Sequence, residues 1–302
     1  MSLPSTPLAT QTSAFRTLSG IGEVAERYDG VILDLWGCIH DGVRPFAGVA
    51  EALRRLKAAG KRVLVVSNAP RRSQAVVESM ERLGLARALY DGVLSSGEVT
   101  WQALARRDDP WHARLGTRCF HIGPERDFGL LEGNGLTRVA EVDAAEFVLV
   151  TGPNDDSLGV EDHADILMAA VRRRLAMVCA NPDLDVVRGG ARLVCAGALA
   201  ARYVAAGGEV RYHGKPYASV YDRGLEWLGV GARARVLAVG DSRRTDIAGA
   251  LAAGLDCAFI PGGVHGEELG VRMGETPPAE AVTLLARRHG AMPTYVLSEL
   301  RW

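Results

Sequence analysis

Long apolar runs, an excess of one charge and a secretory leader are all missing from this sequence. No apolar segment is long enough to cross a membrane. The formal net charge of the 302 residues is -1, so the composition favours neither nucleic acid nor an anionic membrane as a partner. The first residues lack the basic and apolar segments of a signal peptide. We therefore expect a cytoplasmic protein with a loose N-terminal tail over residues 1–20.

Cysteine is scarce and is never paired at short spacing. The five cysteines are scattered through apolar segments, and no CxxC pair is present. Such cysteines are typical of small buried side chains in a reducing compartment, not of disulfides or a metal site. Cys38 is the nearest of them to the polar motifs below, and packing is the better interpretation for it too. The pair Arg71-Arg72 is likewise interpreted as a solvated helix face.

Strand-like and helix-like segments alternate along the chain, which indicates βαβ units and a mainly parallel sheet. Strands are predicted at 31–36, 62–67, 92–96, 119–123, 147–152, 175–181, 235–239, 257–260 and 294–297. Helices are predicted at 46–59, 71–83, 162–174, 196–206, 217–228, 245–253 and 279–288. A new series of alternating strand-like and helix-like segments begins beyond Gly97, which suggests that a second, smaller α/β unit is inserted into the first. The chain is long enough for two such domains.

Polar residues follow several of the predicted strands. An apolar, β-branched run ends in Asp34, which places a carboxylate where open α/β sheets bind their ligands. Ser67-Asn68 follows the next strand, and a hydroxyl beside free backbone N–H groups suits a phosphate oxygen. Lys215 stands in a Gly-Lys-Pro turn before a helix and could neutralise a phosphate. Asp241 and Asp246 follow a third apolar strand, and carboxylates on neighbouring strand ends favour Mg²⁺.

In this order and spacing, the motifs resemble those of the haloacid dehalogenase superfamily of phosphatases. Asp34 matches the aspartate nucleophile, and Ser67 matches the phosphate-binding hydroxyl of the second motif. Lys215 matches the lysine of the third motif, and Asp241 with Asp246 match the acidic fourth motif.

The segment between the second and third motifs resembles the cap of class IIA, the subclass that contains sugar-phosphate, phosphoglycolate and pyridoxal-phosphate phosphatases. Asn181-Pro182-Asp183 resembles the signature of that subclass, and Gly37 and Asn68 fit it too. The resemblance implies an α/β fold with a doubly wound, mainly parallel core formed by residues 1–96 and 197–302. Residues 97–196 would then form the inserted, smaller α/β cap.

The resemblance also implies a Mg²⁺-dependent phosphatase that acts on a small phosphorylated metabolite. Asp34 would attack phosphorus and form an aspartyl-phosphate, while Lys215 and Mg²⁺ screen the repulsion between the two anions. The predicted metal site consists of Asp34, the backbone carbonyl of Trp36 and Asp241. Asp246 belongs to the same site and would act mainly by orienting a water molecule or Lys215. The predicted phosphate-binding residues are Ser67, Asn68, Lys215 and Gly37. The predicted substrate loop of the cap contains Asn181 and Asp183.

One position departs from the pattern of the superfamily. The residue two positions after the nucleophile is normally an aspartate that protonates the leaving alkoxide and then activates water, and here it is Trp36. An indole N–H can only donate, so it cannot serve as an acid–base group. His40 lies nearby in sequence and is the better candidate for a replacement, although a half-buried loop histidine is the simpler interpretation.

Other functions remain as alternatives. A protein that binds a phosphorylated ligand, or regulates through it, with weak or lost catalysis, would keep Asp34, Lys215 and Asp241 and could tolerate Trp36. A dinucleotide-dependent oxidoreductase is disfavoured, because Gly20-Ile21-Gly22 precedes the first strong strand instead of following one. Dehalogenation in this superfamily does without Mg²⁺. It is disfavoured here because the sequence keeps the acidic metal motif. The resemblance leaves homodimerisation through the cap open.

Overall fold

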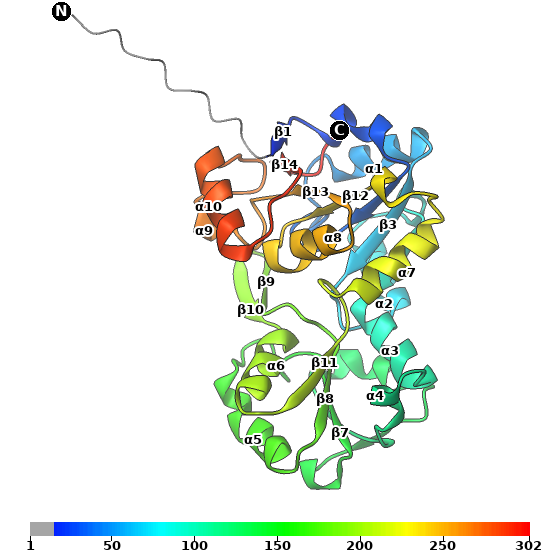
Figure 1. Ribbon diagram of the computed structural model, residues 1–302, viewed down its shortest axis with the longest axis vertical. Helices are drawn as coiled ribbons and strands as arrows, with labels where there is room; N and C mark the ends of the chain where they lie inside the picture. The colour runs from blue at the N-terminus through cyan, green and yellow to red at the C-terminus, as the bar shows by residue number, and fades with distance from the viewer. Residues whose placement is uncertain (1–14) are drawn as a thin grey trace, which may run out of the picture.

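The computed structural model describes residues 15–302, and its backbone folds into two α/β units that lie one above the other in Figure 1. The larger unit contains both ends of the described chain, and the smaller one is inserted into it. Residues 1–14, which make up most of the predicted tail, lie outside the described residues. Within residues 15–302, the structure contains no helix with the length and apolar character needed to span a membrane.

The larger unit, or core, is built on a seven-stranded sheet in which every neighbouring pair is parallel. The order of its strands is β1-β14-β13-β12-β2-β3-β4. These strands are β1 (Arg16–Leu18), β2 (Gly30–Leu33), β3 (Arg62–Ser67), β4 (Gly92–Ser95), β12 (Val236–Gly240), β13 (Asp256–Phe259) and β14 (Tyr295–Leu297). Both faces of the sheet are covered by helices, as expected for a doubly wound fold.

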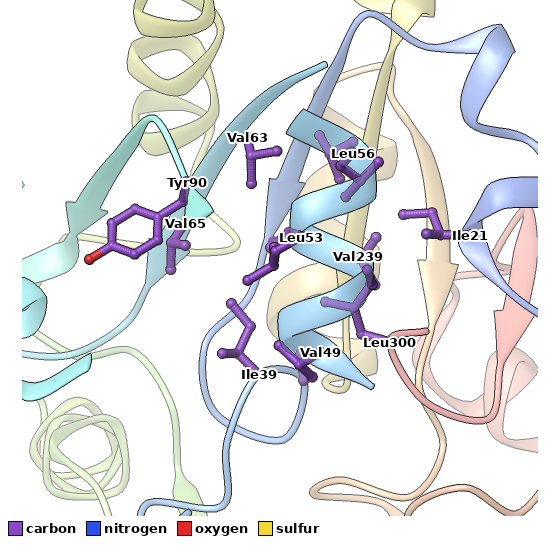
Figure 2. Close-up of a cluster of buried hydrophobic side chains, with 14 of the residues drawn as sticks. Ile21, Ile39, Val49, Leu53, Leu56, Val63, Val65, Tyr90, Val239 and Leu300 are labelled. Atoms are coloured by element: carbon purple, nitrogen blue, oxygen red, sulfur yellow. The ribbon is translucent and has the colours of Figure 1, made fainter. Parts of the chain in front are cut away.

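The two faces of the core sheet have separate apolar clusters. Alternate residues of a strand point to opposite faces, so Val31 and Leu33 join one cluster and Ile32 joins the other. The first cluster includes the apolar side of α1, whose Val49, Leu53 and Leu56 pack over the sheet (Figure 2). The helices of the core are α1 (Val49–Ala58), α2 (Ser73–Arg82), α7 (Ala218–Leu228), α8 (Ala248–Ala252), α9 (Gly266–Leu269) and α10 (Ala279–His289).

The smaller unit, or cap, contains a five-stranded parallel sheet in the order β11-β8-β7-β5-β6 and an antiparallel hairpin, β9-β10. Its strands are β5 (Arg118–Ile122), β6 (Thr137–Val139), β7 (Phe147–Val150), β8 (Ala176–Cys179), β9 (Asp185–Arg188), β10 (Ala191–Val194) and β11 (Glu209–Tyr212). Its helices are α3 (Ser96–Arg106), α4 (Pro110–Ala113), α5 (Ala164–Arg172) and α6 (Ala196–Ala205).

The predicted doubly wound, mainly parallel α/β fold is confirmed, and each predicted strand and helix is found, most of them with shifted ends. The boundary predicted after residue 196 is wrong. Leu199 and Tyr203 of α6 are buried in the cap cluster, and β11 pairs with β8, so the cap extends to Tyr212. The end of the predicted tail is also wrong, because Arg16–Leu18 pairs with β14 and forms an edge of the core sheet.

All five cysteines are buried free thiols, as the sequence predicts.

Candidate active site

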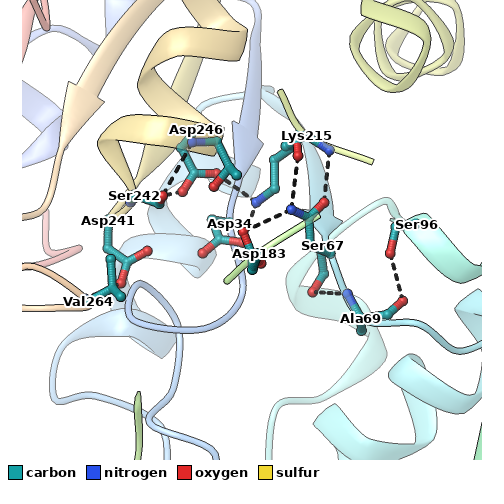
Figure 3. A network of polar contacts seen from close by, with 12 residues as sticks. Asp34, Ser67, Ala69, Ser96, Asp183, Lys215, Asp241, Ser242, Asp246 and Val264 are labelled. Atoms are coloured by element: carbon teal, nitrogen blue, oxygen red, sulfur yellow. Dashed lines mark hydrogen bonds and ion pairs between the residues drawn. The ribbon is translucent and has the colours of Figure 1, made fainter. Parts of the chain in front are cut away.

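Asp34, Lys215 and Asp246 form the centre of a buried polar network at the carboxyl edge of the core sheet (Figure 3). The Lys215 ammonium donates to Asp34 Oδ1 at 2.5 Å and to Asp246 Oδ1 at 2.6 Å. Asp34 follows β2, Asp246 lies in the helical turn after β12, and Lys215 follows β11. Asp34 and Asp246 meet here because the parallel strands of the core sheet place their carboxyl ends at one edge, and the segment that returns from the cap brings Lys215 to the same edge.

Asn68 fixes the backbone of Lys215 and connects the core to the cap. Its Oδ1 accepts from the backbone N–H of Lys215 at 2.8 Å, and its Nδ2 donates to the Lys215 carbonyl oxygen at 3.1 Å. The same Nδ2 donates to Asp183 Oδ1 at 3.1 Å, so a cap residue joins the network. Ser67 is buried beside Asn68, and its Oγ accepts from the backbone N–H of Ala69 at 3.3 Å. The lysine is therefore positioned by backbone as well as by side chain.

Asp241 lies on the other side of Asp34. Its Oδ2 accepts from the backbone N–H of Val264 at 2.7 Å. Gly37 has a φ of 73°, and a Cβ at this position would lie 2.0 Å from Asp241 Oδ2. A side chain at position 37 would therefore displace this carboxylate, which gives the predicted Gly37 a role in admitting Asp241 as well as in the turn after Asp34.

The charges in this network are unbalanced. Burial and the nearby carboxylates of Asp34 and Asp246 raise the pKa of Asp241 well above its ordinary value. Burial and Asp246 also raise the pKa of Asp34, which Lys215 opposes. Burial alone would lower the pKa of Lys215, but Asp246 and Asp34 raise it well above its ordinary value, so the ammonium stays charged. Three buried carboxylates thus share one cation.

This excess of negative charge is what a divalent cation would neutralise. Ligand atoms of Asp34, Cys38 and Asp241 lie within 4.8 Å of one another. Burial raises the pKa of the Cys38 thiol well above its ordinary value, so the carboxylate oxygens are the ligands that fit, and hard oxygen donors suit Mg²⁺. Both oxygens of Asp246 already accept hydrogen bonds, from Lys215 Nζ and from the Ser242 backbone N–H. Asp246 is therefore suited to holding Lys215.

Trp36 lines the cleft beside Asp34, whereas His40 does not. His40 is buried behind Trp36, with the two rings edge to face at a centroid distance of 5.0 Å. Its Nδ1 accepts from the backbone N–H of Gly42 at 2.9 Å, and burial lowers the pKa of His40 to about 4. A neutral imidazole that is hydrogen-bonded behind an indole cannot reach a leaving group. The structure therefore contradicts the suggestion that His40 replaces the missing acid.

A cleft of about 780 Å³ between core and cap leads to this network. Asn181 and Asp183, the predicted substrate loop of the cap, both line it. Asn181 Oδ1 accepts from the backbone N–H of Asp183 at 3.0 Å and so shapes the turn that carries Asp183 to Asn68. The predicted phosphate-binding residues Ser67, Asn68, Gly37 and Lys215 also line the cleft, next to Asp34.

The interpretation of Arg71-Arg72 as a solvated helix face is wrong. Arg72 Nε donates to Glu98 Oε2 at 2.7 Å, and its guanidinium stacks on Trp101. Arg71 is half-buried and lines the cleft. Asp127, in a 3-10 turn of the cap, lines the same cleft and was not predicted. No local pattern could reveal either residue, because the two come together only when the cap lies against the core.

Comparison with known proteins agrees with this geometry. A family profile described as haloacid dehalogenase-like hydrolase matches residues 31–137, and a second profile of HAD-like hydrolases matches residues 212–287. The crystal structure of a haloacid dehalogenase-like hydrolase from Brucella suis has 33% sequence identity and a TM-score of 0.81, and the match covers 94% of this chain and 99% of that one. The chain belongs to the haloacid dehalogenase-like hydrolase family.

Curated relatives point to the capped phosphatases of class IIA. The D-glycerol 3-phosphate phosphatase of Mycobacterium tuberculosis is 28% identical over 80% of this chain and 65% of its own length, so the match covers less than two thirds of that enzyme. The 5'-nucleotidase YutF of Bacillus subtilis is 27% identical over 80% of this chain and 90% of its own length. A solved glycerol phosphate phosphatase from Mycobacterium tuberculosis, in complex with calcium, has 26% identity and a TM-score of 0.61 over 80% of this chain and 68% of that one.

Proposed function

We propose that this protein is a Mg²⁺-dependent phosphatase that hydrolyses a small phosphomonoester through an aspartyl-phosphate on Asp34. The observation that carries the proposal is the buried contact of Asp34 with Lys215, at the base of a cleft that also contains Ser67, Asn68 and Asp241. The phosphatases among the relatives, and the calcium complex of one of them, support a phosphate ester as substrate and a divalent cation as cofactor.

The residues of the chain have distinct tasks in this proposal. One oxygen of Asp34 is held by Lys215, which leaves the other to attack phosphorus. The Lys215 ammonium also reduces the repulsion between the carboxylate and an incoming phosphate dianion. Ser67 offers a hydroxyl to a phosphate oxygen, and Asp246 with Asn68 keeps Lys215 in place. When bound at Asp34 and Asp241, Mg²⁺ would add positive charge for the phosphate oxygens.

Trp36 favours a second candidate, a protein that binds a phosphorylated ligand with weak or lost catalysis. Position 36, two residues after Asp34, carries an indole where the superfamily has its acid. Calorimetry separates the two candidates, because tight Mg²⁺-dependent binding of a phosphate ester with no release of inorganic phosphate supports only the second. We place the phosphatase first because Asp34, Lys215 and Asp241 keep a complete arrangement for attack on phosphorus.

The deciding experiment is a screen of phosphomonoesters, with and without Mg²⁺, on the wild type and on Asp34→Asn. We expect the wild type to release phosphate only with Mg²⁺, and Asp34→Asn to lose turnover by at least about 10³-fold, because an amide is a poor nucleophile. The melting temperature of the variant shows whether it remains folded. Phosphate release by a folded Asp34→Asn protein would exclude the aspartyl-phosphate.

A matched control is Asp91→Asn. Asp91 is a core aspartate that accepts from the backbone N–H of Val63 at 2.7 Å and pairs with Lys57 away from the cleft. Its loss should lower stability but leave turnover by the folded protein within a few-fold of the wild type, since Asp91 does not line the cleft.

A further inference from the structure

Arginine side chains gather on the walls of the cleft, above the phosphate-binding residues. Arg71 comes from the core loop that follows Ser67-Asn68, and Arg82 from the end of α2. Arg126 and Arg188 face them from the cap. The group stands where the leaving part of a phosphomonoester would extend, since its phosphate would rest on Ser67, Asn68 and Lys215 below.

These four guanidiniums, which we call the cleft arginines, differ in their partners. Arg126 lies 2.7 Å from one oxygen of Asp156 and Arg188 lies 3.1 Å from the other, so two cations share one carboxylate. Arg82 is exposed. Arg71 is half-buried, yet its side chain makes no hydrogen bond or ion pair with any residue from 15 to 302. Its neighbour Arg72, by contrast, is fully engaged with Glu98.

The surroundings of Arg71 carry more positive than negative charge. Burial lowers the pKa of Arg71, the carboxylate of Asp127 opposes this, and Arg126, Arg82 and Arg188 lower it further. Asp127 does not form an ion pair with Arg71, and its Oδ1 is buried without a partner among the described residues. The charged groups that act most on Arg71 are thus one carboxylate, Asp127, and the three other guanidiniums. A half-buried cation without a partner, next to other cations, is stabilised when an anion occupies the space between them.

We propose that the cleft arginines, with Arg71 at their centre, bind a second anionic group on the leaving alcohol of the substrate. The inference rests on the proposed function, because it assigns the phosphate to Ser67, Asn68 and Lys215. The planar guanidinium of Arg71 presents paired donors that match a carboxylate or a second phosphate. The substrate class is accordingly a phosphomonoester of a hydroxy acid, or a bisphosphate, and not a neutral or cationic ester.

A set of four two-carbon phosphomonoesters tests this inference, because its members differ only in the group at the far end. They are 2-hydroxyethyl phosphate, phosphoglycolate, ethane-1,2-diyl bisphosphate and phosphoethanolamine, with a neutral, carboxylate, phosphate and ammonium end respectively. We expect kcat/KM to be at least about tenfold higher for the carboxylate or the bisphosphate than for the neutral ester, and lowest for the ammonium ester. The two anionic esters, compared with each other, show which anion is preferred.

Arg71→Gln should remove this preference. We expect kcat/KM for the preferred anionic ester to fall by about 10–100-fold, and the value for 2-hydroxyethyl phosphate to change by less than about threefold. Arg72→Gln is the matched control, because it removes the same charge from the neighbouring residue, whose guanidinium lies outside the cleft wall. Arg72→Gln should leave the preference for anionic esters intact. An equal loss for all four esters in Arg71→Gln would overturn the inference, since Arg71 would then serve the shared phosphate or pair with Asp127.

A binding measurement separates failure of this inference from failure of the proposed function. Titration of Asp34→Asn with phosphoglycolate and with 2-hydroxyethyl phosphate, in the presence of Mg²⁺, reports the preference without turnover. If the wild type hydrolyses none of the esters, the proposed function fails, and this titration alone decides the inference. Tighter binding of phosphoglycolate that Arg71→Gln abolishes supports it, and equal affinities for the two ligands contradict it.

Discussion

At the scale of single residues, the unusual position is Trp36. Its indole occupies the cleft wall beside Asp34 and stacks edge to face on His40. Gly42 admits the ring, because a Cβ there would lie 2.2 Å from Trp36 Cζ3. The loop is thus built around the indole, which stands where the superfamily has its acid–base aspartate and cannot donate a proton as an acid. Departure of the leaving alkoxide without protonation should then limit the rate.

This predicts a strong dependence of turnover on the leaving group. The wild type should cleave 4-nitrophenyl phosphate about 10²–10⁴ times faster than an alkyl phosphate of similar size, since a good leaving group needs no general acid. Trp36→Asp should narrow this gap by restoring a carboxyl group, whereas Trp36→Phe removes the indole without adding an acid and should leave it wide. Steady-state kcat for both esters in the three proteins is the measurement. Equal rates for the two esters in the wild type would show that another group donates the proton.

The sequence predicts that Asp34, Ser67 and Asp241 stand at strand ends, as the structure shows, but it does not single out the cleft arginines, for a physical reason. Asp34, Ser67 and Asp241 each stand where an apolar run ends, and this local pattern fixes their place at the edge of the sheet. Arg71 looks like any surface arginine, because its environment is made by cap residues such as Arg126 and Asp127. For His40 the sequence predicts a role in the site that the structure does not support. The residue is near Asp34 in sequence, but its ring does not line the cleft.

At the scale of elements, the sequence predicts the helix α6 but assigns it to the wrong domain. An amphipathic pattern predicts the helix and its apolar side, but not which of two parallel sheets that side covers. Leu199 and Tyr203 pack with β8 and α5, and the following strand, β11, adds to the edge of the cap sheet. Lys215 therefore lies directly after the last cap strand, so the segment that leaves the cap also carries the lysine that pairs with Asp34 and Asp246.

Truncation of Leu199 should therefore destabilise the cap rather than the core. Leu199 is fully buried, so Leu199→Ala should lower the free energy of unfolding by about 2–5 kcal/mol through lost apolar contacts and a cavity. Val204→Ala is the control on the same helix, because Val204 is 48% exposed and its truncation should cost less than about 1 kcal/mol. Urea unfolding followed by hydrogen exchange should show loss of protection in β7, β8 and β11 first. Loss confined to β2 and β3 would assign α6 to the core.

At the scale of the whole molecule, polar contacts join core and cap at the two chain crossings and also at the β9-β10 hairpin, where the Gly189 N–H donates to the Asp41 carbonyl oxygen at 3.0 Å. Ser96 Oγ, at the first crossing, donates to the carbonyl oxygens of Ala180 at 2.5 Å and Ala69 at 3.1 Å. At the second crossing, Asn68 makes hydrogen bonds with Lys215 and with the cap residue Asp183. The same short segments thus join the domains and position Lys215, because Asn68 contacts both Lys215 and the cap residue Asp183.

Buried histidines should make the folded molecule sensitive to acid. Burial lowers the pKa of His121 to about 4 and that of His213 to about 3. In the unfolded chain each titrates at about 6.5. Between these values the unfolded state binds more protons, so the free energy of unfolding falls as the pH drops below 6.5, by up to about 1.4 kcal/mol per pH unit for each histidine. The contribution of each is fully present above pH 6.5 and is lost as the pH falls toward its folded pKa.

Urea unfolding at pH 7.0, 6.0 and 5.0 measures this slope. His121 Nε2 lies 2.9 Å from Thr151 Oγ1, and His121→Gln can keep a polar contact there while removing the titration. We expect this variant to lose less stability than the wild type between pH 7.0 and 5.0, by about 1–2 kcal/mol. Parallel slopes for His121→Gln and the wild type would mean that His121 is not held neutral by the fold.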